Sequence, residues 1–236
     1  MRRLAFFLFL FFQLLAFHTL KAQVGEYRSA LAIGVNGGYA LNRVSFTPTN
    51  KQVYHGGPTM GVTLRYTRER YFKMMCALQM EVNYTQLGWK EDIETSGDTY
   101  SRTVNYLQVP LLARLGFGRE VKGVMGYLVL GPQVAYYLSD KDKRGGEWSD
   151  ESLDLRPNHG VEQNDLPIQH KLEYGLTGGR GLEVNTRHAG HFMIEGRYYF
   201  GLSNLFKDGK KDTFARSANG AIVAKVSYLF DVFSRK

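Results

Sequence analysis

Charged residues stand among apolar or small residues at several points of this 236-residue chain. Three are carboxylates and four are cations: Glu81, Glu173, Glu195, Arg65, Arg114, Arg197 and Lys225. Paired carboxylates can perform acid–base catalysis when their protonation states differ. Here the cations are as plentiful as the carboxylates, which favours ion pairs that neutralise charge in a buried polar network. We therefore interpret the seven residues as structural and predict no catalytic residue among them.

Histidine and serine are the other residue types here that could carry chemistry. His188 and His191 in "HAGH" could suggest metal ligands, but no acidic or cysteine ligand accompanies them, so we expect surface residues and no metal. Four further residues lie in or beside the longest connection: Ser149, Ser152, His159 and His170. A lipid-hydrolysing barrel enzyme could place a nucleophile and its base there. No spacing motif joins the four, so we predict no enzymatic activity and no cofactor.

The amino terminus has the pattern of an export signal. Arg2 and Arg3 precede an apolar run from Leu4 to about Phe17, and Ala22 stands at a position suited to cleavage. A membrane-spanning helix would need about 20 apolar residues, and this run is shorter. We predict a signal peptide over residues 1–22, followed by a single barrel domain over residues 23–236.

Composition narrows the class of protein further. Cys76 is the only cysteine in the sequence, so the fold is not held by an internal disulfide. Without Arg2, Arg3 and Lys21, the 30 basic residues fall to 27 against 22 acidic ones, an excess of five. This excess is modest, and the chain has no basic helix or recognition motif, so we expect no nucleic-acid partner.

Alternating apolar and polar residues recur along the rest of the chain, and no run has convincing helical spacing. Eight strands are predicted, spanning Leu31–Asn42, Gly57–Arg68, Lys73–Lys90, Tyr100–Phe117, Val124–Ser139, Gln169–Val184, Gly190–Asn204 and Ser217–Phe233. Long and short connections alternate between them, as in barrels with short periplasmic turns and longer extracellular loops. The expected fold class is all-β: an eight-stranded, antiparallel, up-and-down transmembrane β-barrel of the outer-membrane type.

The strand Lys73–Lys90 shows how the two faces of a strand differ. Its even-numbered residues form an apolar row from Met74 to Tyr84, whereas the opposite row turns polar around Glu81. Apolar rows facing inward would give a soluble, lipocalin-like barrel with an apolar ligand cavity. Charges of both signs flanked by small residues near strand middles instead suit a narrow polar interior, so we predict apolar rows that face lipid.

Aromatic residues near the strand ends support the same orientation. We expect them to form girdles at the level of the lipid headgroups: Tyr71, Phe72, Tyr84, Trp89, Tyr100 and Phe117. The last strand ends almost at the carboxyl terminus, which leaves both chain ends on the side of the short turns. This arrangement is typical of an outer-membrane barrel.

Four segments carry a resemblance to a known family: "LAIGVNGGYALN", Tyr106–Phe117, Leu128–Ser139 and Phe192–Phe206. With the signal peptide, they resemble the PorT-like outer-membrane β-barrel family of Bacteroidetes over nearly the whole mature chain. The resemblance implies an outer-membrane location in a Gram-negative bacterium. It also implies a link to type IX protein secretion, in which the named member of that family is implicated. No catalytic or ligand motif can be carried over from the family.

The lumen of an eight-stranded barrel is just wide enough for side chains to fill, which disfavours an open channel. We therefore predict a non-enzymatic structural or docking component of the cell envelope. Its expected partners are outer-membrane lipid and lipopolysaccharide, together with other envelope or secretion proteins. The long connection Asp140–Ile168 offers Trp148, Leu153 and Leu155 as candidate partner contacts. The alternatives are a narrow passive pore, a ligand-binding barrel and an outer-leaflet lipid hydrolase.

Overall fold

The computed structural model describes residues 26–49, 51–71, 74–91, 98–118, 122–146, 149, 164, 166–186, 189–207 and 214–235. The predicted signal peptide lies outside these ranges. Nine strands run through them: β1 (Glu26–Thr47), β2 (Gln52–Val53), β3 (His55–Tyr71), β4 (Met74–Glu91), β5 (Thr99–Gly118), β6 (Gly123–Gly145), β7 (Leu172–Asn185), β8 (His191–Gly201) and β9 (Arg216–Arg235). In the same ranges, no helix is long and apolar enough to cross a membrane.

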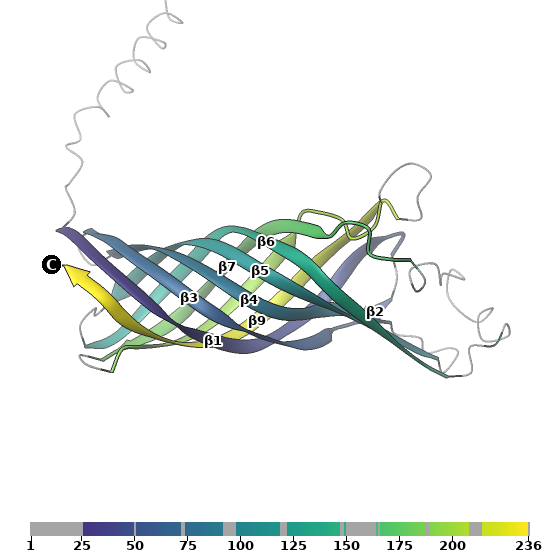
Figure 1. Ribbon diagram of the computed structural model, residues 1–236, viewed down its shortest axis with the longest axis horizontal. Coiled ribbons are helices and arrows are strands. Elements are labelled where there is room, and N and C mark those ends of the chain that lie inside the picture. Colours follow the sequence, from purple (N-terminus) through teal and green to yellow (C-terminus); the bar gives the residue numbers. More distant parts are fainter. Residues whose placement is uncertain are drawn as a thin grey trace, which may run out of the picture.

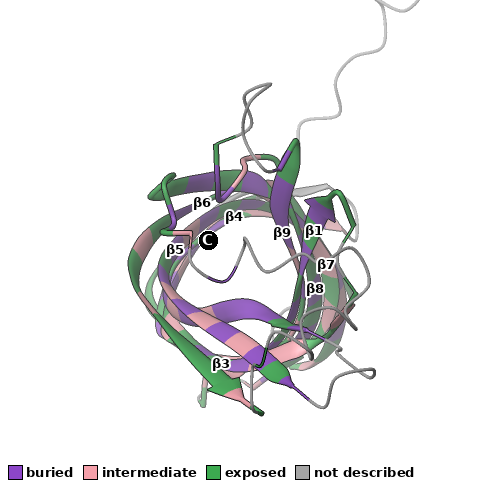
Figure 2. Ribbon diagram, turned by 90° about the vertical axis from the view of Figure 1, so that its right-hand side faces the viewer, coloured by how far each residue is buried: buried purple, intermediate pink, exposed green. Residues whose placement is uncertain are grey.

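Eight of the strands close into a ring (Figures 1 and 2). Each of them pairs antiparallel with the next along the chain, and β9 returns to pair with β1 from Ser29–Arg235 to Thr47–Arg216. The two-residue β2 lies beside the end of β4 as a short addition. A closed sheet leaves no unpaired edge, which is the condition for crossing hydrocarbon with strands. The predicted eight-stranded antiparallel up-and-down barrel is confirmed.

The two faces of each strand differ as the alternation predicted. On β4 the outward-facing Leu78 and Met80 are 49% and 40% exposed, whereas Gln79 and Glu81 between and beside them are each 1% exposed. Figure 2 shows the same alternation of buried and exposed residues around the ring. A wide belt of apolar side chains therefore covers the outside of the barrel, and the polar rows face its interior.

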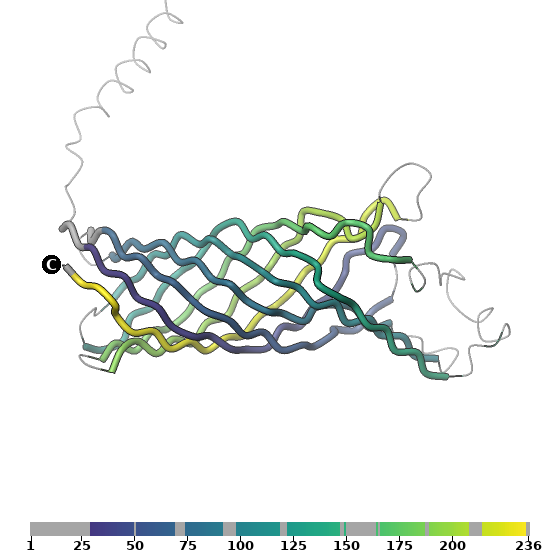
Figure 3. Tube along the Cα trace, in the orientation of Figure 1, coloured from purple at the N-terminus to yellow at the C-terminus, as the bar shows by residue number. Residues whose placement is uncertain are grey.

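The connections sort to the two ends of the barrel. The turns β3–β4, β5–β6 and β7–β8 lie at one end with the start of β1 and the end of β9 (Figures 1 and 3). Gly118 and Gly123 flank the β5–β6 turn with φ of 138° and 134°, a region of backbone conformation that favours glycine. The strand ends that the longer connections join lie at the opposite end, which we assign to the cell surface.

At this outer end, two strands extend further than the sequence predicted. The connection expected over Asp140–Ile168 begins later, because β6 stays paired with β5 as far as Gly145 opposite Thr99. Likewise β1 continues to Thr47 and pairs with Arg216 of β9. These extensions keep hydrogen-bonded ladders intact beyond the apolar belt. Polar side chains there hid the strand signal in the sequence.

Charge placed on the apolar belt tests this orientation. We predict that Leu111→Arg or Val226→Arg blocks accumulation in the outer membrane. Both side chains face outward, and an arginine on the lipid face near the midplane costs about 2–4 kcal/mol. The measurement is the amount of folded protein in isolated outer membranes. Thr99→Arg, at the exposed tip of β5, is the matched control and should accumulate normally. Normal accumulation of all three variants would mean that the belt faces water.

Candidate functional site

The inward rows of the barrel hold the charged residues singled out in the sequence. All seven are at most 6% exposed: Arg65, Glu81, Arg114, Glu173, Glu195, Arg197 and Lys225. They come from six strands, β3, β4, β5, β7, β8 and β9, and they fall into three groups along the barrel axis. The structure joins six of the seven in ion pairs and leaves Glu173 apart from the cations.

The central group surrounds Glu81. Arg197 and Lys225 each approach this carboxylate, with N–O distances of 2.6 Å from Arg197 Nη2 to Oε1 and from Lys225 Nζ to Oε2. The side-chain amides of Gln79 and Asn83 donate to the same carboxylate at 2.8 Å. Glu195 pairs with Arg197 from the other side. Glu81 is thus fully coordinated by donors, which is what a buried carboxylate needs in order to stay charged.

The second group lies toward the end with the short turns and is centred on Glu183. Arg65 Nη1 lies 2.7 Å from Glu183 Oε2, and Arg114 pairs with the same oxygen. The Arg114 guanidinium also stacks over the Tyr127 ring, 3.6 Å from its centroid. Such a guanidinium gains from the ring quadrupole as well as from the carboxylate. Glu183 was missed in the sequence, although it stands on the same alternate row as Glu173.

His191 joins this second group, so the expectation of a surface residue is wrong. Its Nδ1 lies 2.9 Å from Glu183 Oε1, and its Nε2 lies 3.1 Å from Asp231 Oδ1. The reason is its position as the first residue of β8, on the same inward row as Met193 and Glu195. His188 lies outside the described residues. Within the described ranges, no cluster of histidine, cysteine or acidic side chains could hold a metal ion.

Glu173 forms the third group with neutral partners. Tyr199 donates its hydroxyl to Oε1 at 2.8 Å, and Asn219 donates its amide to Oε2 at 2.7 Å. We expected one of the cations to neutralise this carboxylate, and that expectation is wrong. The four cations lie deeper in the barrel, where Glu81, Glu183 and Glu195 bind them.

An aromatic cap closes the outer mouth of the barrel above Glu173. Phe46 lies against Trp89, Phe206 and Phe214, with ring centroids 5.6, 6.3 and 4.9 Å apart. Trp89 and Tyr100 are both fully buried in this cluster, so their expected place in the headgroup girdle is wrong. They stand on the inward rows of β4 and β5, and Phe206 and Phe214 fold inward from the β8–β9 connection. Tyr71 and Phe72 have no described side chain.

Little space remains between the cap and the central ion pairs. A cavity of about 20 Å³ lies there, lined among others by Gln133, Thr177, Arg197 and Tyr199. That volume holds about one water molecule. Charged and aromatic side chains thus fill the lumen, as an eight-stranded geometry dictates. The arrangement is suited to a rigid plug rather than to passage of solutes.

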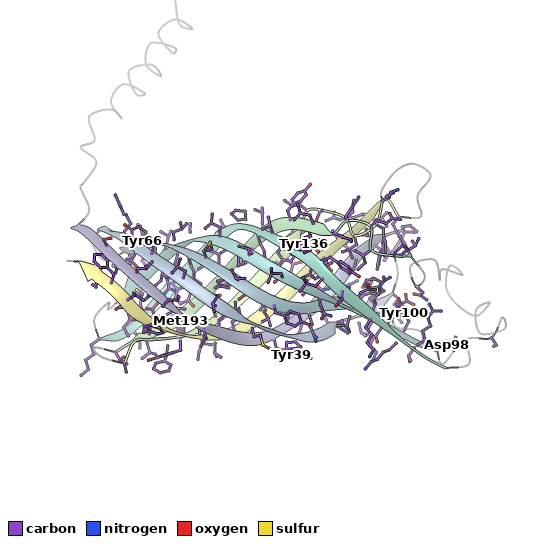
Figure 4. The ribbon with its side chains drawn as sticks, viewed as in Figure 1. Tyr39, Tyr66, Asp98, Tyr100, Tyr136 and Met193 are labelled. Atoms are coloured by element: carbon purple, nitrogen blue, oxygen red, sulfur yellow. The ribbon has the colours of Figure 1, made fainter. Side chains whose placement is uncertain are left out.

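The outer ends of β5 and β6, residues 99–105 paired with residues 139–145, project beyond the cap and have their own polar contacts. Arg102 pairs with Asp140 at 2.6 Å and donates to the Leu166 carbonyl at 2.7 Å. Tyr137 donates to the same aspartate. Burial raises the pKa of Tyr100 to about 12, and burial together with the Asp140 contact raises the pKa of Tyr137 to about 12. Figure 4 shows Tyr100 and Asp98 at this projecting end.

The remaining sequence candidates concern the long connection after β6. Trp148, Leu153 and Leu155 lie outside the described residues, as do Ser152 and His159. His170 lies in the described part, and its Nδ1 is 2.9 Å from the Asn204 carbonyl oxygen. That contact ties the connection to the residues after β8.

Closed antiparallel strands, an apolar outer belt and a polar plugged lumen define a β-barrel protein of the outer membrane. The family described as "Outer membrane protein beta-barrel domain" matches residues 21–207, and the chain belongs to this family. The match is to this broad family and does not show the PorT-like group within it. The location in the outer membrane follows from the family and the fold.

Solved structures of other outer-membrane proteins are similar to this chain at low sequence identity. One is Ail, the attachment invasion locus protein of Yersinia pestis, in complex with the heparin analogue sucrose octasulfate. Ail is 16% identical in sequence, the match covers 85% of this chain and 99% of that one, and the TM-score is 0.35. Neisserial surface protein A is 15% identical, with coverage of 87% and 100% and a TM-score of 0.42. The outer membrane enzyme PagL is 12% identical, with coverage of 85% and 98% and a TM-score of 0.39. No curated protein matches.

Removal of the central carboxylate tests the lumen network. We predict that Glu81→Leu lowers the free energy of unfolding by about 3–5 kcal/mol, because Arg197 and Lys225 would stay buried without their partner. The measurement is urea unfolding in lipid vesicles, followed by tryptophan fluorescence. Lys143→Ala at the exposed outer end of β6 is the control and should change stability by less than about 0.5 kcal/mol. Equal, small effects of both variants would mean that water solvates the charges in the lumen.

Proposed function

We propose that the protein is a non-enzymatic docking component of the cell envelope. The observation that carries this proposal is the closed lumen. Ion pairs fill its middle and the part toward the short turns, and an aromatic cluster fills its outer mouth. A barrel filled in this way gains rigidity and offers solutes no wide path. Its useful surfaces are therefore those outside the lumen. Because one fold can host many activities, the proposal rests on these surfaces and not on the fold.

The extracellular end is the surface best suited to a protein partner. The outer ends of β5 and β6 are joined by the Arg102–Asp140 ion pair, and the Leu166 carbonyl anchors the return of the long connection to the same arginine. A connection of this length is usually functional when it is not disordered. We propose that the partner contacts lie in it, with Trp148, Leu153 and Leu155 as apolar anchors. A partner within the type IX secretion machinery is our proposal from the PorT-like resemblance.

A second feature supports lipopolysaccharide as a partner. Arg43 and Arg216 face outward near the outer rim and line a groove that also includes Tyr198, Phe200 and Ile222. The Arg216 guanidinium lies 5.6 Å from the centre of the Phe200 ring. Cations above apolar and aromatic side chains match a phosphorylated headgroup above acyl chains. This rim would anchor the barrel in the outer leaflet.

The docking proposal predicts that the long connection binds the partner. Replacement of residues 146–165 by a short glycine–serine linker should remove the partner and leave the barrel folded, because the ladders end at Gly145 and begin again at Leu172. Affinity purification from native membranes with mass spectrometry gives the partner, and heat-dependent gel mobility reports folding. A variant with a replaced β7–β8 turn is the control and should keep the partner. Retention of the partner by the first variant would place the docking surface elsewhere.

Conductance separates docking from the passive-pore alternative. We predict that the purified protein in planar bilayers gives no stable conductance steps, because the aromatic cap and the Glu81 ion pairs fill the lumen. A porin inserted under the same conditions provides the positive control. Reproducible steps from the wild-type protein would favour a pore and would contradict the closed lumen.

A further inference from the structure

Within the described strands, one cation interrupts the apolar belt on the outside of the barrel. Arg180 lies on the outward face of β7, where it is exposed and pairs across the sheet with Leu128 and Gly196. Gly196 is the sixth of the eleven residues of β8, the shortest of the ring strands, so Arg180 lies near the middle of the membrane-spanning part. Among the described residues, no hydrogen bond or ion pair joins its side chain to a neighbour. The barrel itself does not neutralise this charge.

A charged side chain in this position is costly unless something outside the barrel compensates it. Hydrocarbon cannot solvate a guanidinium, and arginine on the lipid face of a barrel is most destabilising near the midplane. Other outward-facing arginines of the described strands, such as Arg43 and Arg216, lie at the outer rim within reach of water and headgroups. Arg180 therefore marks a contact within the membrane.

The surface beside Arg180 is hollowed by glycine. Gly126, Gly178 and Gly196 share the outward face of β6, β7 and β8, and an apolar groove next to them is lined by Leu128, Leu182 and Ile194. A Cβ added at Gly196 would meet no atom within 4 Å, and one added at Gly126 would meet only Leu182, at 4.0 Å.

Packing inside the barrel therefore does not require glycine at positions 126 and 196. Glycine weakens a strand interior and often marks a place where another backbone approaches closely. Small residues serve the same purpose where segments pack within membranes. The glycines point to a packing surface independently of the charge.

From these two observations we propose that the outward face of β6–β8 docks a membrane-embedded segment of another outer-membrane protein, one that carries an aspartate or glutamate at mid-depth. The carboxylate would pair with Arg180, and the segment would pack into the groove at Gly196. This surface is separate from the extracellular end of the barrel, and the inference does not depend on the proposed function.

Other occupants fit less well. Lipid phosphates lie at the edges of an apolar band about 25 Å tall, so they do not reach its middle. A second copy of this chain offers no outward-facing carboxylate at mid-depth among the described strands, since Asp231 lies near the end of β9. Two copies facing each other would also bring two Arg180 side chains together. Charge complementarity therefore selects a different membrane protein.

Stability in lipid alone gives the first test. Wild-type protein and the Arg180→Leu variant are reconstituted in phosphatidylethanolamine vesicles with and without phosphatidylglycerol, which contain no partner. We expect a higher urea midpoint for Arg180→Leu in both lipids, because the unpaired charge is removed. Arg216→Leu at the rim is the matched control and should not raise the midpoint. An unchanged or lower midpoint for Arg180→Leu would mean that lipid already satisfies Arg180, and would overturn the proposal.

Crosslinking in intact outer membranes gives the second test. A photoreactive residue at position 194, beside the groove, should yield an adduct with a second outer-membrane protein. The same residue at position 62 on β3, across the ring, should not. The adduct should disappear in Arg180→Leu and Gly196→Leu and persist in Arg180→Lys, and its crosslinked peptide should contain an aspartate or glutamate. Lipid adducts alone, an adduct with a second copy, or an adduct that persists in Arg180→Leu would overturn the proposal.

Discussion

Every backbone amide in the spanning strands must find its hydrogen-bond partner within the protein, because hydrocarbon offers none. The ring meets this constraint when β9 returns to pair with β1 along nearly its whole length. Closure with eight strands then fixes a narrow lumen, and alternate side chains of each strand face the lipid and the barrel interior. The apolar belt, the buried charges and the aromatic cap all follow from that geometry.

In the narrow lumen, ion pairs between strands contribute to holding the strands in place. The ion pairs join side chains from different strands, so they form only when those strands are correctly placed. Glu81 of β4, for example, binds Arg197 of β8 and Lys225 of β9. Loss of one partner leaves an unpaired charge out of water, so an incorrect strand register that separates the partners is penalised. Above the ion pairs, the Phe46 cluster seals the mouth with apolar area. The lumen is thereby filled by charged and aromatic side chains.

Period-two alternation was sufficient to predict the fold, because an outward row such as Leu78 and Met80 contrasts sharply with Gln79 and Glu81. The errors arose where a residue was judged by its type rather than by its row. Trp89 was expected among headgroup aromatics, and His191 was expected at the surface, yet the parity of each along its strand directs it inward.

Other features could not be derived from alternation. Glu173 pairs with Tyr199 and Asn219 because the cations lie at other depths, and depth depends on strand tilt and register. The extension of β6 to Gly145 depends on ladder bonds to β5, whose polar residues carry no apolar signal. The contacts proposed for the long connection depend on residues outside the described ranges.

The central claim is that alternate rows of the same strand face lipid and a closed interior. Site-directed spin labels on the outward row of β4, at Leu78, Met80 and Val82 in a Cys76→Ala background, test it most directly. In reconstituted vesicles, collisions with oxygen should be frequent at all three labels, and a water-soluble nickel reagent should be excluded from them. A label at Ser139, on the projecting outer part of β6, should show the reverse. Nickel collisions at Met80 as frequent as at Ser139 would place the apolar row in water and contradict the account.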